Sequence, residues 1–484
     1  MKHLMIMKKQ ALLIALCAVI FTTACKKSTV DDTPGGTGPL GTTAVEVSTD
    51  ITTNTTWTAD KMYLIKNIIN VVNGATLTIE AGTLIKGDKA TKATLVINRG
   101  GKINAIGTVD KPIVFTSNQP VGARAASDWG GIVILGKAPN NQGNDTPIEG
   151  ITSTSDATKT SHGGTDPADN SGTLKYVRIE FAGVPLSPDN EINGLTLGSV
   201  GSGTTLDYIE VYRSGDDAFE FFGGTVNAKH LLAIGTLDDD FDADFGYSGK
   251  VQFALAQRFI NLADISGSNG FETDNDGSGS AKTPLTGAVF SNVTVIGPLS
   301  AANMSGFNAN YQHAAQIRRN SSLSILNSIF TGYTEGIYID DSKVTVPKAT
   351  SSNYLTGKIV FENNLIFGTN SKNNEVKGEN KADFETMIRA SNTFTAASYG
   401  GVLITDPYKY APDIIAGAKQ GTPTFTVKTG SAAETGAVFT NAKVADAFFE
   451  KVAYRGAFGS TDWSTGWANY NPQVMPYDAP GKVK

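Results

Sequence analysis

Acidic side chains are concentrated in three short runs in the middle of this 484-residue chain. Several of these carboxylates recur at every second position, and oxygen ligands spaced in this way suit Ca²⁺, which accepts flexible geometry. The runs are Asp216, Asp217 and Glu220; Asp238, Asp239, Asp240, Asp242 and Asp244; and Glu272, Asp274 and Asp276. If a metal is bound, we expect it to be Ca²⁺, held by Asp240, Asp242, Asp244, Glu272, Asp274 and Asp276.

Two of these runs match part of a calcium-binding loop. Residues Asp240–Gly246 carry carboxylates at alternating positions and end in glycine, and residues Glu272–Gly277 do the same. The second run has Thr283 at its twelfth position, where such a loop carries a bidentate glutamate. Two other interpretations therefore stay open: a solvated acidic face without a ligand, and a site of catalytic carboxylates.

The acidic residues lie in segments with the two-residue period of a strand that buries one face. The first positions of five such segments are spaced by 22, 30, 36 and 30 residues, which predicts the coils of a solenoid. The expected inward column is Phe219, Phe241, Phe271, Phe307 and Ile337. The expected outward columns are Glu220, Asp242, Glu272, Asn308 and Tyr338, and Phe222, Asp244, Asp274, Asn310 and Asp340.

Carboxylates on neighbouring coils would stand about 4.8 Å apart and repel one another unless water, a cation or a basic ligand lies between them. We predict that Glu220, Asp242, Asp244, Glu272 and Asp274 form the ligand-binding surface. Two carboxylates at a suitable separation could instead hydrolyse a glycosidic bond. A lyase would need a base as well, for which the candidates are Lys250, Arg258, Arg318 and Arg319.

Short alternating strands separated by glycines also fill the region before these runs, at Ala75–Gly87, Thr94–Thr108 and Pro112–Ser117. Together with Asp128–Gly136, they resemble the opening coils of right-handed parallel β-helix proteins of the pectin-lyase-like class, and in particular a group of Bacteroidetes surface lipoproteins. The resemblance implies an all-β, right-handed parallel β-helix solenoid with short capping helices. Proteins of that class include polysaccharide lyases, hydrolases, adhesins and proteins without known activity, so the resemblance implies a fold rather than a function.

A second set of strands carries Asn292, Asn327 and Asn363 in comparable places, and we expect these side chains to form an amide ladder between coils. Residues Asn140–Gly172 are polar and predict a long loop, in which His162 would be a solvated histidine. The other two candidate histidines, His230 and His313, are expected to be packing or surface residues.

The N-terminus has the pattern of a targeting segment. Lys8 and Lys9 precede an apolar run from Ala11 to Phe21, which is too short to span a bilayer, and Cys25 follows. This resembles a bacterial lipoprotein signal, which implies removal of residues 1–24 and lipidation of Cys25. Thr22 stands where leucine is commoner in such signals, so cleavage by the ordinary secretory peptidase stays open as an alternative. Residues 25–43 predict a flexible tether.

Residues 44–484 are expected to form a single β-helix domain, with a C-terminal cap from about residue 440. We predict short helices at Ala382–Ala390 and Ala442–Val452. Trp463, Trp467 and Tyr470 are expected to cover the last coil, although aromatic rings can also stack on sugars.

The formal net charge is −6, and without residues 1–24, which include three lysines and no acid, it would be −9. A basic stripe is absent from the sequence, which argues against nucleic acid as a partner. We expect a monomeric outer-membrane lipoprotein, exposed at the cell surface and held at the membrane by its lipid. The favoured function is non-catalytic binding of a glycan or cation, or a scaffold role; the alternative is a polysaccharide lyase or glycoside hydrolase.

Overall fold

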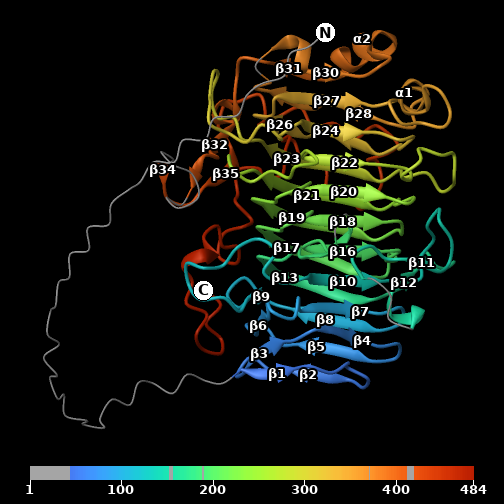
Figure 1. Cartoon of the computed structure of the whole chain (residues 1–484). Coiled ribbons are helices and arrows are strands. Elements are labelled where there is room, and N and C mark those ends of the chain that lie inside the picture. The colour runs from blue at the N-terminus through green and yellow to red at the C-terminus, as the bar shows by residue number, and fades with distance from the viewer. Residues whose placement is uncertain (1–43, 152–155, 188–189, 370, 411–418) are drawn as a thin grey trace, which may run out of the picture. The chain divides into compact units, whose positions relative to one another are not determined.

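Most strands of the chain lie in two large parallel sheets in the computed structural model (Figure 1). The structure describes residues 44–151, 156–187, 190–369, 371–410 and 419–484. The expected signal segment, the lipidated Cys25 and the tether lie outside the described residues. By its internal contacts, the described part of the chain, residues 44–484 with the gaps just given, lies in one compact unit.

The first large sheet has ten strands, one from each successive coil, and each strand pairs in parallel with the strand of the next coil. The coils stack in chain order, so neighbours in the sheet are neighbours along the sequence (Figure 1). The strands are β4 (Ile68–Val71), β7 (Thr94–Ile97), β10 (Gly131–Leu135), β16 (Leu195–Gly198), β18 (Phe219–Phe222), β20 (Phe241–Asp244), β22 (Phe271–Thr273), β24 (His313–Ile317), β27 (Glu335–Ile339) and β30 (Val376–Lys377).

The second large sheet has seventeen strands and supplies the other two sides of each coil. In the middle coils one long strand bends at a corner: the first part of β13 pairs with β8, and its second part pairs with β9. The strands are β1 (Val45–Val47), β2 (Thr55–Trp57), β3 (Met62–Ile65), β5 (Thr76–Ile79), β6 (Leu84–Gly87), β8 (Lys102–Ile106), β9 (Ile113–Ser117), β13 (Gly172–Glu180), β17 (Thr205–Tyr212), β19 (Asn227–Ile234), β21 (Lys250–Gln257), β23 (Val289–Ile296), β25 (Ser324–Leu326), β26 (Ile329–Thr331), β28 (Phe361–Glu362), β29 (Leu365–Phe367) and β31 (Thr393–Thr395). The expected all-β parallel β-helix is confirmed.

The inward residues of all coils form a continuous apolar core. Phe219, Phe241 and Phe271 stand in register in β18, β20 and β22, and their ring centroids are 5.7 and 5.2 Å apart. The predicted column is therefore confirmed for these three coils. The prediction is wrong for the next coil, because its strand is His313–Ile317 and Phe307 lies in the preceding loop. The loop before this strand is longer than the predicted 36-residue spacing between coils assumed. As a result, the residue paired with Glu272 is Gln316 and not the predicted Asn308.

A column of residues with positive φ forms the corner of the long strands, and it continues into the later coils. Asn292 and Asn327 do occupy equivalent places, but their Nδ2 atoms donate to the backbone oxygens of Tyr454 and Val438. A direct ladder of asparagine amides is therefore wrong, because the C-terminal segment takes these hydrogen bonds. Bonding between coils is still present: Asn327 Nδ2 also donates to Oγ of Ser291, and Asn292 Oδ1 accepts from Gln252. The corner residues are Tyr176, Tyr208, His230, Phe253, Asn292, Asn327 and Asn363.

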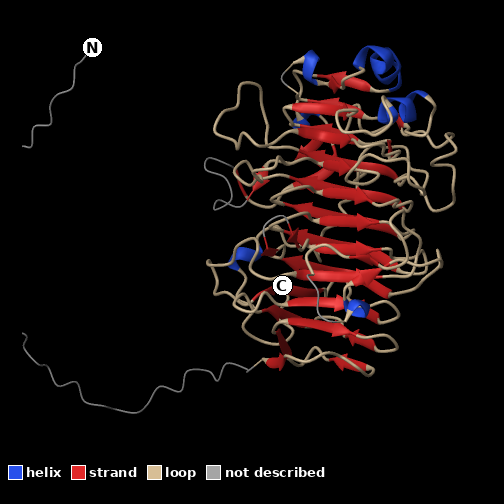
Figure 2. Cartoon of the chain, turned by 45° about the vertical axis from the view of Figure 1, so that its right-hand side comes forward, coloured by secondary structure: helices blue, strands red, loops and turns tan. Residues whose placement is uncertain are grey.

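Short elements project from the coils or cover their ends. The helices α1 (Ala349–Leu355) and α2 (Lys381–Ser391) lie together at one end of the stack (Figure 2), where α2 buries Phe384 and Ile388. The predicted helix at Ala382–Ala390 is confirmed, whereas Ala442–Val452 forms turns and the prediction of a helix there is wrong. The short strand pairs are β11 (Thr146–Pro147) with β12 (Ser161–His162), β14 (Pro185–Ser187) with β15 (Asn190–Glu191), β32 (Ile404–Asp406) with β35 (Thr424–Val427), and β33 (Lys409–Tyr410) with β34 (Lys419–Gln420). Single 3-10 turns lie at Ala157–Lys159, Lys372–Asn374, Gly400–Val402 and Pro472–Val474.

The C-terminal strap, residues 428–484, runs along the side of the coils instead of covering the last one (Figure 1). Trp467 is fully buried against Tyr176 and Tyr208 of the middle coils. Further along the strap, the backbone oxygen of Val483 accepts a hydrogen bond from the buried Arg178. The aromatic residues near the C-terminus are therefore a lateral seal, and the expectation that they cover the last coil is wrong.

The three histidines among the described residues are structural. His162 is fully buried, with Nδ1 2.8 Å from the hydroxyl of Ser199, so the expectation of a solvated residue is wrong. Burial lowers the pKa of His162 to about 3, so its ring is neutral. His230 stacks on Tyr208 with 4.1 Å between ring centroids, and His313 lies 2.7 Å from the carboxylate of Glu335. Among the helices of the described residues, none is long and apolar enough to cross a membrane.

Candidate functional site

Carboxylates from several coils meet in one pocket of about 710 Å³ over β18, β20 and β22. Their side chains alternate with the buried phenylalanines of the same strands, so they lie on the outer face of the sheet. Among the described residues, only two basic ones, Arg318 and Arg319, line the pocket with them. The acidic lining residues are Glu149, Glu191, Asp216, Asp217, Glu220, Asp238, Asp239, Asp242, Asp244, Asp264, Glu272 and Asp274.

A column of acids crosses the pocket because the strands stack in register. Asp242 pairs with Glu220 of the preceding coil and with Glu272 of the following coil. Adjacent strands are about 4.8 Å apart, which is close enough for neighbouring carboxylates to repel strongly. The structure thus brings together the five residues that the sequence analysis assigned to a ligand-binding surface: Glu220, Asp242, Asp244, Glu272 and Asp274.

Three overlapping groups of acids in this pocket could each hold a metal ion, because one oxygen from each member lies within 4.8 Å of the others. Asp217 belongs both to the group with Asp216 and Asp238 and to the group with Glu220. Asp242 belongs to that second group and also to the third group, with Asp239 and Glu272. The first and third groups share no residue, so two ions could occupy them together. The groups are Asp216, Asp217 and Asp238; Asp217, Glu220 and Asp242; and Asp239, Asp242 and Glu272.

Burial and mutual repulsion disfavour the charged form of these acids. Burial raises the pKa of Asp242 well above its ordinary value, and the neighbouring carboxylates Glu272 and Asp244 raise it further. Burial also raises the pKa of Glu272 to about 7 and that of Asp238 to about 6, in spite of nearby arginines. A bound cation would reverse this effect, since opposite charge favours the ionised carboxylate.

The two arginines of the pocket are held by carboxylates. Arg318 donates to Glu272 and to Asp274, with 2.7 Å between its Nε and Oδ1 of Asp274. Arg319 Nη1 lies 2.5 Å from the other oxygen of Asp274. Burial alone would lower the pKa of Arg318, but these carboxylates outweigh burial and raise it. An arginine held in this way keeps its proton and cannot act as a base.

Two of the predicted metal ligands are not in the pocket. Asp240 is fully buried behind the sheet, where its Oδ2 lies 2.8 Å from Nε of Arg258. Asp276 accepts hydrogen bonds from the backbone N–H groups of Ser278 and Ser280 and so closes a turn. The other four predicted metal ligands, Asp242, Asp244, Glu272 and Asp274, do lie together in the pocket.

The remaining candidate bases also lie elsewhere. Arg258 is bound to Asp240, and Lys250 lies 2.6 Å from Asp446 of the C-terminal strap. In return, the pocket gains three acids that the sequence analysis did not single out: Glu149, Glu191 and Asp264. Glu149 and Asp264 come from loops, and Glu191 comes from the short strand β15 outside the coils. No periodic signal could have placed them, because the path of such excursions does not follow from residue spacing.

A comparison with protein families agrees with this architecture. The family described as "pectate-lyase like beta helix domain" matches residues 49–403. This chain belongs to that family. The match includes every residue of the acidic pocket, and it excludes the C-terminal strap.

Two solved structures are similar to this chain at low identity. The crystal structure of pectate lyase Pel9A is 14% identical, with a TM-score of 0.39, and the alignment covers 81% of this chain and 89% of that one. The crystal structure of the Dettilon tailspike protein is 10% identical, with a TM-score of 0.23, covering 70% and 63%. No curated protein matches this chain in sequence. Membership of the pectate-lyase-like β-helix family establishes the fold and leaves the activity to be argued from the site.

Proposed function

We propose that the acidic pocket binds divalent cations, Ca²⁺ first among them, and that the protein is a non-catalytic cation- and glycan-binding β-helix protein. The observation that carries this proposal is the charge of the pocket: twelve carboxylates face two arginines, both already ion-paired. Four of these acids, Asp217, Glu220, Asp239 and Asp274, are buried, and most of the others are partly buried. Carboxylates this close together are stabilised when protons or cations neutralise them. Ca²⁺ fits because it takes many oxygen ligands and tolerates irregular geometry.

The acidic lining of the pocket and its ion-paired arginines also disfavour a lyase. Such an enzyme removes a proton from its substrate and needs a basic group that can accept it. Among the described residues, no lysine lines the pocket. The carboxylates of Asp274 and Glu272 hold Arg318 and Arg319 in their charged form. A pocket with cations and no base can retain an acidic glycan through metal bridges without cleaving it.

A glycoside hydrolase is the second candidate, because one observation favours it. A hydrolase of this kind needs a carboxylic acid that keeps its proton near neutral pH beside a second, ionised carboxylate. Burial raises the pKa of Glu272 to about 7, and an oxygen of Asp242 lies within 4.8 Å of it. Release of reducing ends from a polysaccharide, lost in Glu272→Gln, would favour this candidate over binding alone.

The proposed setting is the cell envelope. The lipoprotein-like sequence around Cys25 and the polar residues 25–43 support an outer-membrane lipoprotein whose folded part stands away from the bilayer at the cell surface. Membrane fractionation of the protein and of Cys25→Ala tests this part by itself. A protein that stays with the membrane after the substitution would contradict lipidation at Cys25.

The test of cation binding is a calorimetric titration of the chelator-treated full chain with CaCl₂, with MgCl₂ as a comparison. We expect saturable binding of Ca²⁺ and a rise in the unfolding free energy of about 2.7 kcal/mol when free Ca²⁺ is a hundredfold above Kd. A glycan array probed with Ca²⁺ and again with chelator then tests whether glycan binding depends on the ion. Absence of heat and of any shift in the thermal midpoint would refute the cation site.

A further inference from the structure

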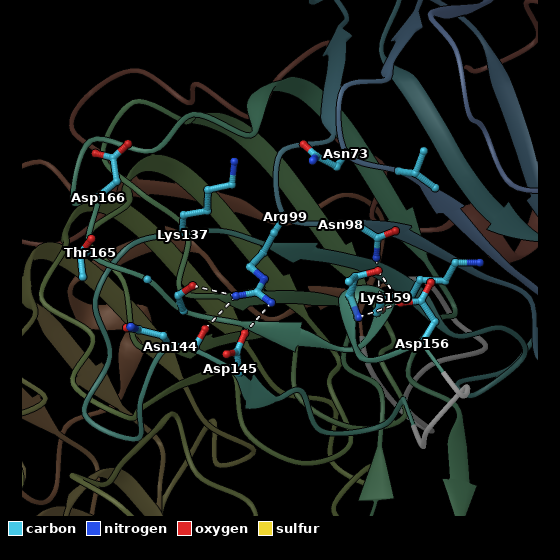
Figure 3. Close-up of a pocket in the computed structure, with 14 residues that line it drawn as sticks. Asn73, Asn98, Arg99, Lys137, Asn144, Asp145, Asp156, Lys159, Thr165 and Asp166 are labelled. Atoms are coloured by element: carbon cyan, nitrogen blue, oxygen red, sulfur yellow. Dashed lines mark hydrogen bonds and ion pairs between the residues drawn. The ribbon is translucent and has the colours of Figure 1, made fainter.

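A second pocket, of about 760 Å³, lies beside the first three strands of the ten-stranded sheet, away from the acidic column. One wall follows the ends of β4, β7 and β10, and the other wall is formed by residues that flank the strands β11 and β12, among them Asn144, Asp145 and Lys159 (Figure 3). Pockets of roughly 300–1,000 Å³ are typical for small-molecule ligands. The proposed function above makes no use of this pocket.

Its lining carries balanced charge. Arg99, Lys137 and Lys159 face the same number of aspartates, so the formal charges sum to zero. Arg99 is fully engaged: Nη2 lies 2.7 Å from Asp145, and Nη1 donates to the backbone oxygen of Asn144 (Figure 3). Lys159 lies 2.6 Å from Asp50. These two cations therefore hold the walls in place and are not available to a ligand.

Three polar side chains in the pocket keep hydrogen-bonding capacity to spare among the described residues. Lys137 has no ion pair and carries no dashed contact in Figure 3. The amide of Asn73 makes no hydrogen bond, and it lies near Lys137, because a Cβ added at Gly100 would collide with Oδ1 of Asn73 and lie 2.9 Å from Nζ of Lys137. The two groups thus converge over a glycine that leaves room between them.

The third group is Asn98, which is only 3% exposed and lines the pocket. Its Nδ2 donates to Oδ1 of Asn70 and to the backbone oxygen of Lys159, but its Oδ1 has no partner. This oxygen has almost no solvent-accessible surface, so it belongs to the packed edge of the pocket and is not a contact for a ligand. Lys137 and Asn73 are the groups that a ligand can reach.

We propose that this pocket binds a short, neutral, hydroxyl-rich saccharide. Hydroxyl groups both donate and accept, so one saccharide can accept hydrogen bonds from the ammonium of Lys137 and the amide of Asn73. The zero net charge of the lining favours a neutral ligand over an acidic one. The lining contains no aromatic side chain that could stack on a nucleobase, and none of the groups of three acids identified above lies here.

The experiment is a calorimetric titration of the full chain with neutral trisaccharides of glucose, galactose, mannose and xylose, with trigalacturonate as the charged comparison. We expect at least one neutral trisaccharide to bind and its Kd to rise at least tenfold in Lys137→Met and in Asn73→Ala. Lys102→Met is the matched control, because Lys102 is an exposed lysine of β8 outside the pocket, and it should bind as the parent does. Thermal midpoints within a few degrees of the parent would confirm that the variants fold.

The result is separable from the cation site. Binding should persist with chelator and in Asp242→Asn, whose side chain belongs to the acidic pocket. Failure of every neutral trisaccharide to bind would overturn the proposal, as would binding that Lys137→Met and Asn73→Ala leave unchanged. Binding of trigalacturonate alone would overturn it too. Loss of Ca²⁺ binding with saccharide binding intact would refute only the cation site.

Discussion

Arg258 and Asp240 form an ion pair with both side chains fully buried, 2.8 Å between Nε and Oδ2. Asp240 stands in the same alternating run as Asp242 and Asp244, yet its carboxylate points behind the sheet and theirs point into the acidic pocket. The guanidinium of Arg258 also donates to the backbone oxygens of Thr236 and Asn269 and to the hydroxyl of Tyr333. This arrangement joins neighbouring coils.

Breaking the ion pair between Arg258 and Asp240 should destabilise the folded protein. Arg258→Met leaves the carboxylate of Asp240 buried without its cation, and we expect a loss of about 3–5 kcal/mol in the free energy of unfolding. Lys229→Met removes a partner of Glu450 in an exposed pair, and about 0–1 kcal/mol is expected there. Denaturant unfolding at pH 7 measures both. Equal, small losses in the two variants would show that the buried pair adds no stability.

Asp242 should matter more for cation binding than Asp244, its neighbour on β20. Asp242 belongs to two of the three groups of acids that could hold an ion, and Asp244 belongs to none of them. We expect Asp242→Asn to weaken Ca²⁺ binding at least tenfold and Asp244→Asn to weaken it less. The ion-free Asp242→Asn protein should also be more stable than the parent at pH 8, because one repelling charge is gone. Titration calorimetry measures the Ca²⁺ affinity, and thermal unfolding measures the stability of the ion-free protein. A larger loss of Ca²⁺ affinity in Asp244→Asn than in Asp242→Asn would contradict the assignment of Asp242 as the more important ligand.

The stability of the ion-free protein should fall as the pH rises from about 4 to 7. The folded-state pKa values of Glu272 and Asp238, about 7 and about 6, lie above the ordinary values of 4.5 and 3.8. The folded state therefore binds more protons than the unfolded state in this window, and each extra proton lowers stability by about 1.4 kcal/mol per pH unit. Saturating Ca²⁺ should flatten the profile, since it replaces the protons. A profile that rises with pH in chelator would contradict the raised pKa values.

The C-terminal strap should contribute to the stability of the middle coils. Trp467 is fully buried against Tyr176 and Tyr208, so Trp467→Ala should cost about 3–5 kcal/mol. Val474 is 57% exposed on the same strap, and Val474→Ala should change stability by about 0.5 kcal/mol at most. Denaturant unfolding compares them. If the two variants lose equal stability, the strap is not a seal of the coils.

The sequence by itself determined the stacking elements and the central part of the site. The two-residue alternation with one buried face requires strands, and the repeated Phe-acid pattern placed Glu220, Asp242 and Glu272 in one column, which the strand register confirms. The amphipathic residues of α2 likewise predicted a helix, because its apolar side is continuous. These features depend on local periodicity, and periodicity is visible in the sequence.

Only the tertiary structure decided what the loops and the buried charges do. Alternation puts Asp240 beside Asp242 on one face, but the long-range ion pair with Arg258 turns it away from the pocket. The acids Glu149 and Asp264 reach the pocket on loops, and Trp467 seals coils far away in the sequence. Each of these placements depends on contacts between residues that are distant along the chain, and such contacts are set by packing and by the pairing of buried charges, which no local pattern records.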